Sequence, residues 1–125
     1  MASMNPARPA VLIVEDEVLL RMDAADLVEE AGFAAIEAAD ADEAVAILEA
    51  RADIALLFTD VNMPGSMDGL KLAHEVRRRW PSMRIVIVSG HLQVGNHELP
   101  ADSRFFGKPF QARRMIVELR AMLAN

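Results

Sequence analysis

Polar side chains stand at the ends of several short apolar runs in this sequence. Glu15 and Asp16 follow one run, Asp60 follows another, Ser89 closes a third, and Lys108 follows a weaker one. Three carboxylates gathered within a few ångströms repel one another by roughly 4 kcal/mol per pair, at about 4 Å and an effective dielectric of about 20. Either one carboxyl group keeps its proton or a cation sits among them.

A magnesium ion suits such a group better than zinc does. The site would offer oxygen ligands only, because the chain has no cysteine and no well-placed histidine, and Mn²⁺ is a possible substitute. A bound divalent ion would attract a phosphoryl group, whose other oxygens Lys108 and Ser89 could bind. A carboxylate oxygen of Asp60 would then lie in line with phosphorus. Asp60 is therefore the candidate nucleophile, forming an acyl phosphate.

The elements that must position these groups alternate between strands and helices. Apolar runs lie at residues 10–14, 33–38, 54–59, 84–89 and 103–106. Runs that are apolar throughout indicate a parallel sheet covered on both faces, and the alternation predicts right-handed crossovers. The fold class is therefore α/β: a doubly wound, five-stranded, flavodoxin-like three-layer sandwich. In the strand order 2-1-3-4-5, ligands bind beyond the carboxyl ends of strands one and three.

Helical periodicity fills the segments between the runs. Leu20, Ala24, Leu27 and Ala31 line one face of the first helix, which is expected to stop at Gly32. Asp40 is a candidate cap for the second helix. The segment at residues 91–102 has little amphipathic pattern, so the fourth helix is expected to be short or mobile. We expect a disordered leader at residues 1–9 and one domain at residues 10–124.

Composition excludes several classes of protein. The chain has 125 residues, a formal charge of −6 and a pI near 5.0, which disfavours nucleic acid and anionic membranes as partners. No run is long enough to span a membrane, and the absence of cysteine allows a reducing cytoplasm. A single cytoplasmic domain with an aliphatic core is expected.

Four segments in order, "VLIVEDE", "LLFTDVNMPG", "IVIVSG" and "FFGKPF", resemble the receiver domain of bacterial two-component response regulators. The resemblance runs from about Pro9 to Leu123. It implies that Asp60 accepts phosphate from a histidine kinase or a histidine phosphotransfer protein and that the phosphate is slowly lost again. It also implies that Asp16 and Asp60 bind Mg²⁺ directly, that Glu15 assists through water, and that the main-chain carbonyl of Asn62 completes the shell.

The resemblance assigns further roles. Ser89 and Phe105 would form a switch pair, the Lys108–Pro109 bond would be cis, and Asn62 and His91 would tune how fast water removes the phosphate. The loop between Met63 and Asp68 is one residue longer than the commonest family form. The stretch before Lys108 is shorter than usual, at a surface that many members use for dimerisation or output. The chain is thus expected to be a monomer or a phosphorylation-dependent dimer with an unknown downstream partner, as a stand-alone relay or a segment of a longer protein.

Simpler interpretations stand beside these. Glu15 and Asp16 suit a helix N-terminus, Asp60 a turn, and Lys108 a solvated surface. A haloacid-dehalogenase-like phosphatase also uses an aspartate after a parallel strand, but it needs a second acid where this chain has Asn62. A flavodoxin-like flavin binder would meet repulsion from the acids after the first strand. A receiver-like module that is never phosphorylated is the remaining alternative.

Overall fold

The computed structural model describes residues 8–63, 65, 67–90 and 98–124. Five strands form one sheet in the order β2-β1-β3-β4-β5, and every neighbouring pair is parallel. The strands are β1 (Ala10–Val14), β2 (Ala34–Ala38), β3 (Ile54–Asp60), β4 (Arg84–Ser89) and β5 (Ser103–Gly107). The helices are α1 (Val18–Glu30), α2 (Ala41–Ala50), α3 (Gly69–Arg79) and α4 (Ala112–Leu123).

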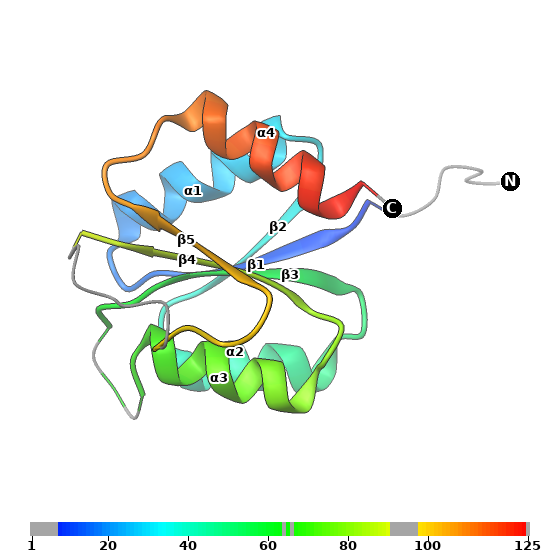
Figure 1. Ribbon diagram of the computed structural model, residues 1–125, viewed down its shortest axis with the longest axis vertical. Helices are drawn as coiled ribbons and strands as arrows, with labels where there is room; N and C mark the ends of the chain where they lie inside the picture. The colour runs from blue at the N-terminus through cyan, green and yellow to red at the C-terminus, as the bar shows by residue number, and fades with distance from the viewer. Residues whose placement is uncertain (1–7, 64, 66, 91–97, 125) are drawn as a thin grey trace, which may run out of the picture.

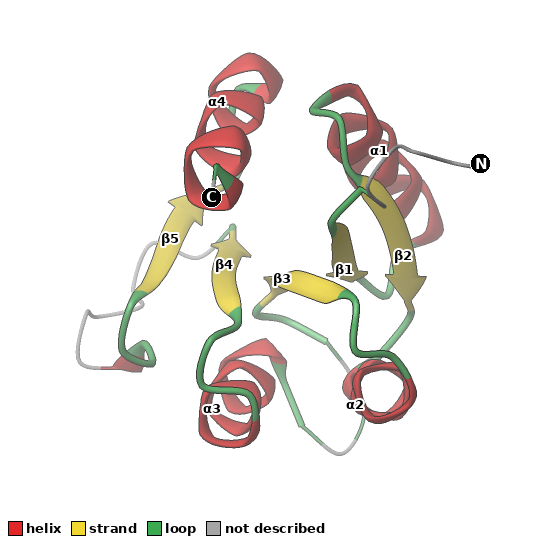
Figure 2. Ribbon diagram, turned by 90° about the vertical axis from the view of Figure 1, so that its right-hand side faces the viewer, coloured by secondary structure: helices red, strands yellow, loops and turns green. Residues whose placement is uncertain are grey.

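The helices cover both faces of the sheet, which makes the predicted three-layer sandwich (Figures 1 and 2). Helices α1 and α4 lie over one face and α2 and α3 over the other. Alternate residues of one strand therefore enter different cores: Leu12 packs on the α2 and α3 side, and Ile13 on the α1 and α4 side. All of β1 is buried, because a central parallel strand has no solvent face.

Local signals set the helix ends. The Asp40 carboxylate accepts a hydrogen bond from the Glu43 amide at 2.9 Å, and Asp68 caps α3 through the Lys71 amide at 2.9 Å. Gly32 follows α1 with a φ of 105°, a backbone conformation that glycine adopts without strain. Leu20 lines the same groove as Ala24 and Leu27, but it is 41 % exposed, because it faces the space between α1 and α4 rather than the core.

The connection between β4 and β5 is described only in part. Residues 91–97, which carry most of the helix predicted there as short or mobile, lie outside the described residues, as do residues 1–7 of the predicted leader. The end of the connection lies on α3: His74 Nε2 is 2.7 Å from the carbonyl oxygen of Glu98, and Arg77 Nε donates to Ala101 O at 2.9 Å. None of the described helices is long and apolar enough to cross a membrane.

Candidate functional site

The buried polar residues of the described chain gather at one edge of the sheet. They are Glu15, Thr59, Asp60 and Ser89, each at or directly after the carboxyl end of a strand. Desolvating a polar group costs free energy unless that group finds a partner. Four buried polar residues at one rim of an otherwise aliphatic core therefore make this rim the candidate functional site.

Three carboxylates meet at this rim, as the strand order predicted. One oxygen from each of Glu15, Asp16 and Asp60 lies within 4.8 Å of the others. Asp16 is exposed, whereas Glu15 and Asp60 are 5 % and 8 % exposed. The β1 and β3 strands are neighbours in the sheet, so their carboxyl ends bring together acids that are far apart in sequence.

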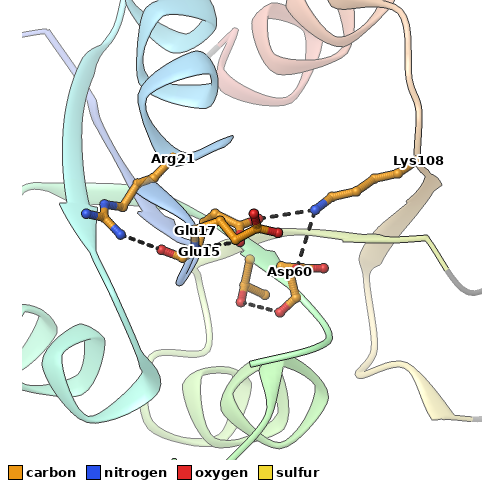
Figure 3. Close-up of polar contacts among 6 residues, drawn as sticks. Glu15, Glu17, Arg21, Asp60 and Lys108 are labelled. Atoms are coloured by element: carbon orange, nitrogen blue, oxygen red, sulfur yellow. Dashed lines mark hydrogen bonds and ion pairs between the residues drawn. The ribbon is translucent and has the colours of Figure 1, made fainter. Parts of the chain in front are cut away.

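The Lys108 amine points into this cluster rather than into solvent (Figure 3). Its Nζ lies 3.1 Å from Glu15 Oε1 and 3.4 Å from Asp60 Oδ2. The backbone holds the lysine at the rim, because Lys108 N donates to Ser89 O at 2.8 Å. The Lys108–Pro109 peptide bond is cis, the conformation that the resemblance implied.

Burial and neighbouring charges shift the pKa of Glu15 in opposite directions, and the same is true of Lys108. Burial raises the pKa of Glu15, although a hydrogen bond from the Glu17 amide and the adjacent Lys108 act to lower it. Burial also opposes the charge of Lys108, but the Asp60 and Glu15 carboxylates outweigh it and raise the lysine pKa. The ammonium group therefore stays charged at neutral pH, opposite more carboxylates than it can neutralise.

The chemistry of this donor set fits a hard divalent cation. Carboxylate oxygens from three residues converge, and the chain offers no thiolate. Mg²⁺ prefers such oxygen ligands and keeps several waters, which the exposed side of Asp16 permits. Asn62, the expected source of a main-chain ligand, follows Asp60 by two residues and has an exposed side chain. His91 lies outside the described residues.

Ser89 and Phe105 occupy neighbouring strands. Ser89 is fully buried at the end of β4, and Phe105 is half-buried on β5, opposite Ile87 in the register. Phe105 packs against the core on the α2 and α3 side, whereas Phe106 packs against the core on the other face. The two phenylalanines are therefore not interchangeable.

Sequence reasoning missed the residues that hold the Asp60 backbone. The Thr59 hydroxyl donates to the Asp60 carbonyl oxygen at 2.9 Å. Gly69, the first residue of α3, donates its N–H to Val61 O at 2.9 Å and leaves no room for a side chain: a Cβ there would lie 1.7 Å from the Asp60 carbonyl oxygen. A glycine just after the Asp68 cap was the available signal, but the close approach depends on how α3 packs on β3.

A cavity of about 750 Å³ opens beside the rim and is lined by residues of α1 and of the segment that leads into α4. Its walls include the apolar side chains of Leu27, Phe58 and Phe110, and Asp60 and Lys108 line one end. The acid and the amine can thus be reached from the surface through this groove.

Comparisons with known proteins agree with the geometry. A family described as response regulator receiver domain matches residues 11–120. The sensor kinase CckA of Brucella abortus (strain 2308) is 34 % identical over 117 residues, which are 90 % of this chain and 12 % of CckA. The nitrogen assimilation regulatory protein NtrX of Azorhizobium caulinodans is 39 % identical over 114 residues, or 86 % of this chain and 24 % of NtrX. The chain thus spans less than a quarter of either relative's length.

A solved structure shows the same fold over nearly the whole chain. The response regulator receiver protein from Sinorhizobium medicae WSM419 superposes with a TM-score of 0.86 at 27 % identity, covering 94 % of this chain and 95 % of that one. The receiver domain of the hybrid histidine kinase CckA gives a TM-score of 0.76 at 31 % identity, covering 91 % and 98 %.

Proposed function

This chain belongs to the response regulator receiver family, and from that premise we propose that it accepts a phosphoryl group on Asp60 from a histidine kinase or a histidine phosphotransfer protein. One observation carries the proposal. The Asp60 carboxylate is almost buried, yet it stands in a cluster of acids with the Lys108 amine 3.4 Å from its Oδ2. A turn-forming aspartate or a solvated lysine would not need this arrangement.

The transfer uses the Asp60 carboxylate as nucleophile. One of its oxygens attacks phosphorus, the bond between phosphorus and the donor's histidine nitrogen breaks, and that nitrogen keeps the electron pair. The product is an acyl phosphate. Lys108 supports the reaction as a point charge, because its ammonium already lies between Glu15 and Asp60 and can bind a phosphoryl oxygen that enters there.

Glu15, Asp16 and Asp60 would hold Mg²⁺, with Mn²⁺ as an alternative and the Asn62 carbonyl as a further ligand. A bound divalent ion offsets the negative charge of the phosphoryl oxygens. The protein's own residues position these groups: the strand ends fix the acids, and the Lys108 Nζ lies 3.4 Å from Asp60 Oδ2.

Phosphorylation of Asp60 would change the positions of residues near this rim. The Ser89 hydroxyl would bind a phosphoryl oxygen, and Phe105 would turn inward as Ser89 moves. Asn62 and His91 would set the rate at which water slowly removes the phosphate. The changed surface would bind a downstream protein, as a monomer or as a phosphorylation-dependent dimer, in the cytoplasm and without contact to nucleic acid.

Acetyl phosphate with Mg²⁺ tests the acceptor directly. We expect intact-mass spectrometry to show the addition of one phosphoryl group to the wild-type protein and none to Asp60→Asn. Asp53→Asn is the matched control, because Asp53 is an exposed acid at the opposite end of β3, where Arg51 binds it; this variant should be labelled like the wild type. An adduct that persists in Asp60→Asn would refute the assignment.

A further inference from the structure

We propose that Arg21 is a positioning residue for the acidic cluster: it holds the turn that carries Glu15 and Asp16 by binding the main chain of that turn. The inference rests on the proposed function, because the cluster it serves is the phosphoacceptor site. Arg21 lies on α1, and its side chain is only 17 % exposed.

Arg21 joins three elements of the fold, and Figure 3 shows one of these contacts, the one with the Glu15 carbonyl oxygen. Its Nη1 donates to the carbonyl oxygen of Glu15 at 2.8 Å, and its Nε donates to Glu37 Oε1 at 3.2 Å. Glu37 belongs to β2, Glu15 follows β1, and Arg21 itself is in the first turns of α1. The planar guanidinium fork allows one side chain to serve both acceptors, which a lysine cannot do in the same geometry.

The arginine binds the backbone of Glu15 and leaves its carboxylate for the site. Glu15 Oε1 is paired with Lys108 at 3.1 Å, and Oε2 accepts the Glu17 amide at 3.1 Å. Arg21 therefore adds a positive charge beside the turn without competing for the oxygens that would bind a metal ion. Arg21 binds the Glu15 carbonyl oxygen, whereas Lys108 binds the Glu15 carboxylate.

The rest of the turn is only lightly held. Glu15 N donates to Ala38 O at 3.1 Å, which ties the end of β1 to β2, and the Glu17 bond lies within the turn itself. Asp16 is exposed. Without Arg21, the Glu15 carbonyl would lose its charged donor and the carboxylates would sample a wider range of positions relative to Asp60. Groups that orient metal ligands typically change metal affinity by about 10- to 100-fold when they are removed.

Arg120, a residue of α4, provides a matched control, because it binds the opposite end of α1. Its Nε donates to Ala31 O at 3.0 Å and its Nη2 to Glu30 O at 3.3 Å, so it also binds main-chain carbonyls that belong to α1 or its end. Replacing either arginine by methionine removes a guanidinium group and keeps an unbranched apolar stem. Only Arg21 is beside the acids.

The experiment compares Arg21→Met, Arg120→Met and wild type by calorimetric titration with Mg²⁺, at a temperature where all three are folded. We expect the Mg²⁺ dissociation constant to rise about 10-fold in Arg21→Met and to stay within about twofold in Arg120→Met. In metal-free protein, amide hydrogen exchange at Glu17 should become faster in Arg21→Met only. Glu37→Gln, which keeps the arginine but removes its ion pair, should show a smaller change of the same sign.

The outcomes separate this inference from the proposed function. If wild type binds Mg²⁺ and is phosphorylated, but Arg21→Met has the wild-type dissociation constant and exchange rate, the positioning role is refuted and the acceptor assignment stands. Equal weakening in both arginine variants also refutes it, because the effect would then be general destabilisation. If wild type takes no phosphate, the proposed function fails, and the metal-free exchange rate still decides the role of Arg21. Should Arg21→Met not fold, Glu37→Gln answers the same question.

Discussion

The two ends of the sheet treat charge in opposite ways. At the amino ends of the strands, arginines bind backbone carbonyls: Arg77 Nη1 donates to Pro81 O at 2.9 Å and to Met83 O at 2.7 Å, and Arg84 Nε donates to Met122 O at 3.1 Å. At the carboxyl ends, carboxylates from three residues face the Lys108 amine. At the amino ends, these carbonyl oxygens are hydrogen-bonded within the protein. At the carboxyl ends, three carboxylates face one ammonium group, which leaves a surplus of negative charge.

This difference separates structural charges from charges kept for a ligand. A guanidinium group that binds carbonyl oxygens at the amino ends, far from the acids, holds loops together, so its removal should lower stability and leave metal binding unchanged. A cluster of acids that cannot all be neutralised internally gains free energy when a cation arrives. Variants at the two ends should therefore separate stability from metal binding.

The largest effect is expected for Gly69→Ala, under the acceptor itself. A Cβ would overlap the Asp60 carbonyl oxygen, so α3 must move away from β3, at a cost of about 3 kcal/mol or more. Urea unfolding measures this cost. Gly90→Ala is the control, because, apart from its chain neighbours, no atom of the described residues lies within 4 Å of a Cβ built there. Equal stability of the two variants would contradict the close packing.

Arg77→Met tests the amino ends of the strands, where arginines bind backbone carbonyls. It removes hydrogen bonds to the carbonyls of Pro81, Met83 and Ala101, and we expect a loss of about 2 kcal/mol in the free energy of unfolding. The Mg²⁺ dissociation constant should not change. Arg78→Met is the control, because the Arg78 side chain is 70 % exposed and pairs with Glu75 on the surface. A change in metal affinity in Arg77→Met would mean that the two ends are coupled.

Lys108→Met should affect stability and metal affinity in opposite directions. Without Mg²⁺ the acids lose their cation, and we expect the protein to lose about 1 kcal/mol of stability. With Mg²⁺ the ion no longer competes with the ammonium, so its affinity should rise by roughly 3- to 10-fold. Thermal unfolding with and without Mg²⁺ measures both, since the stabilisation by a ligand grows with the logarithm of its concentration divided by its dissociation constant. Weaker Mg²⁺ binding in this variant would disprove the surplus-charge explanation.

The smallest effect is expected for Asp53→Asn, whose carboxylate pairs with Arg51 Nη2 at 2.6 Å on the surface. The hydrogen bond from Arg51 lowers the pKa of Asp53. Because the folded-state pKa lies below the unfolded one, this carboxylate contributes stability above the unfolded pKa and loses it as the pH falls through the folded pKa. The small difference in melting temperature between wild type and Asp53→Asn should therefore be seen at neutral pH and vanish in acid or at high salt.

Much of the fold was predictable because it follows from local patterns. The runs at 10–14 and 84–89 became strands with those bounds, and Asp40 caps α2 as expected. Leu20 was placed on one helical face with Ala24 and Leu27, yet it is 41 % exposed, because helical periodicity defines a face but not which part of that face a neighbouring helix covers. The attachment of residues 98–101 to α3 had no signal in the pattern.

The sequence by itself determined that acids, a hydroxyl and a lysine reach one rim, since parallel strands in this order place their carboxyl ends together. The tertiary structure alone decided the pairings: Lys108 lies nearer Glu15 than Asp60, Gly69 touches the Asp60 backbone, and Arg21 binds the Glu15 carbonyl. The physical reason is that every residue offers a carbonyl oxygen. An arginine's choice among them depends on packing distances of a few ångströms, which residue types do not encode.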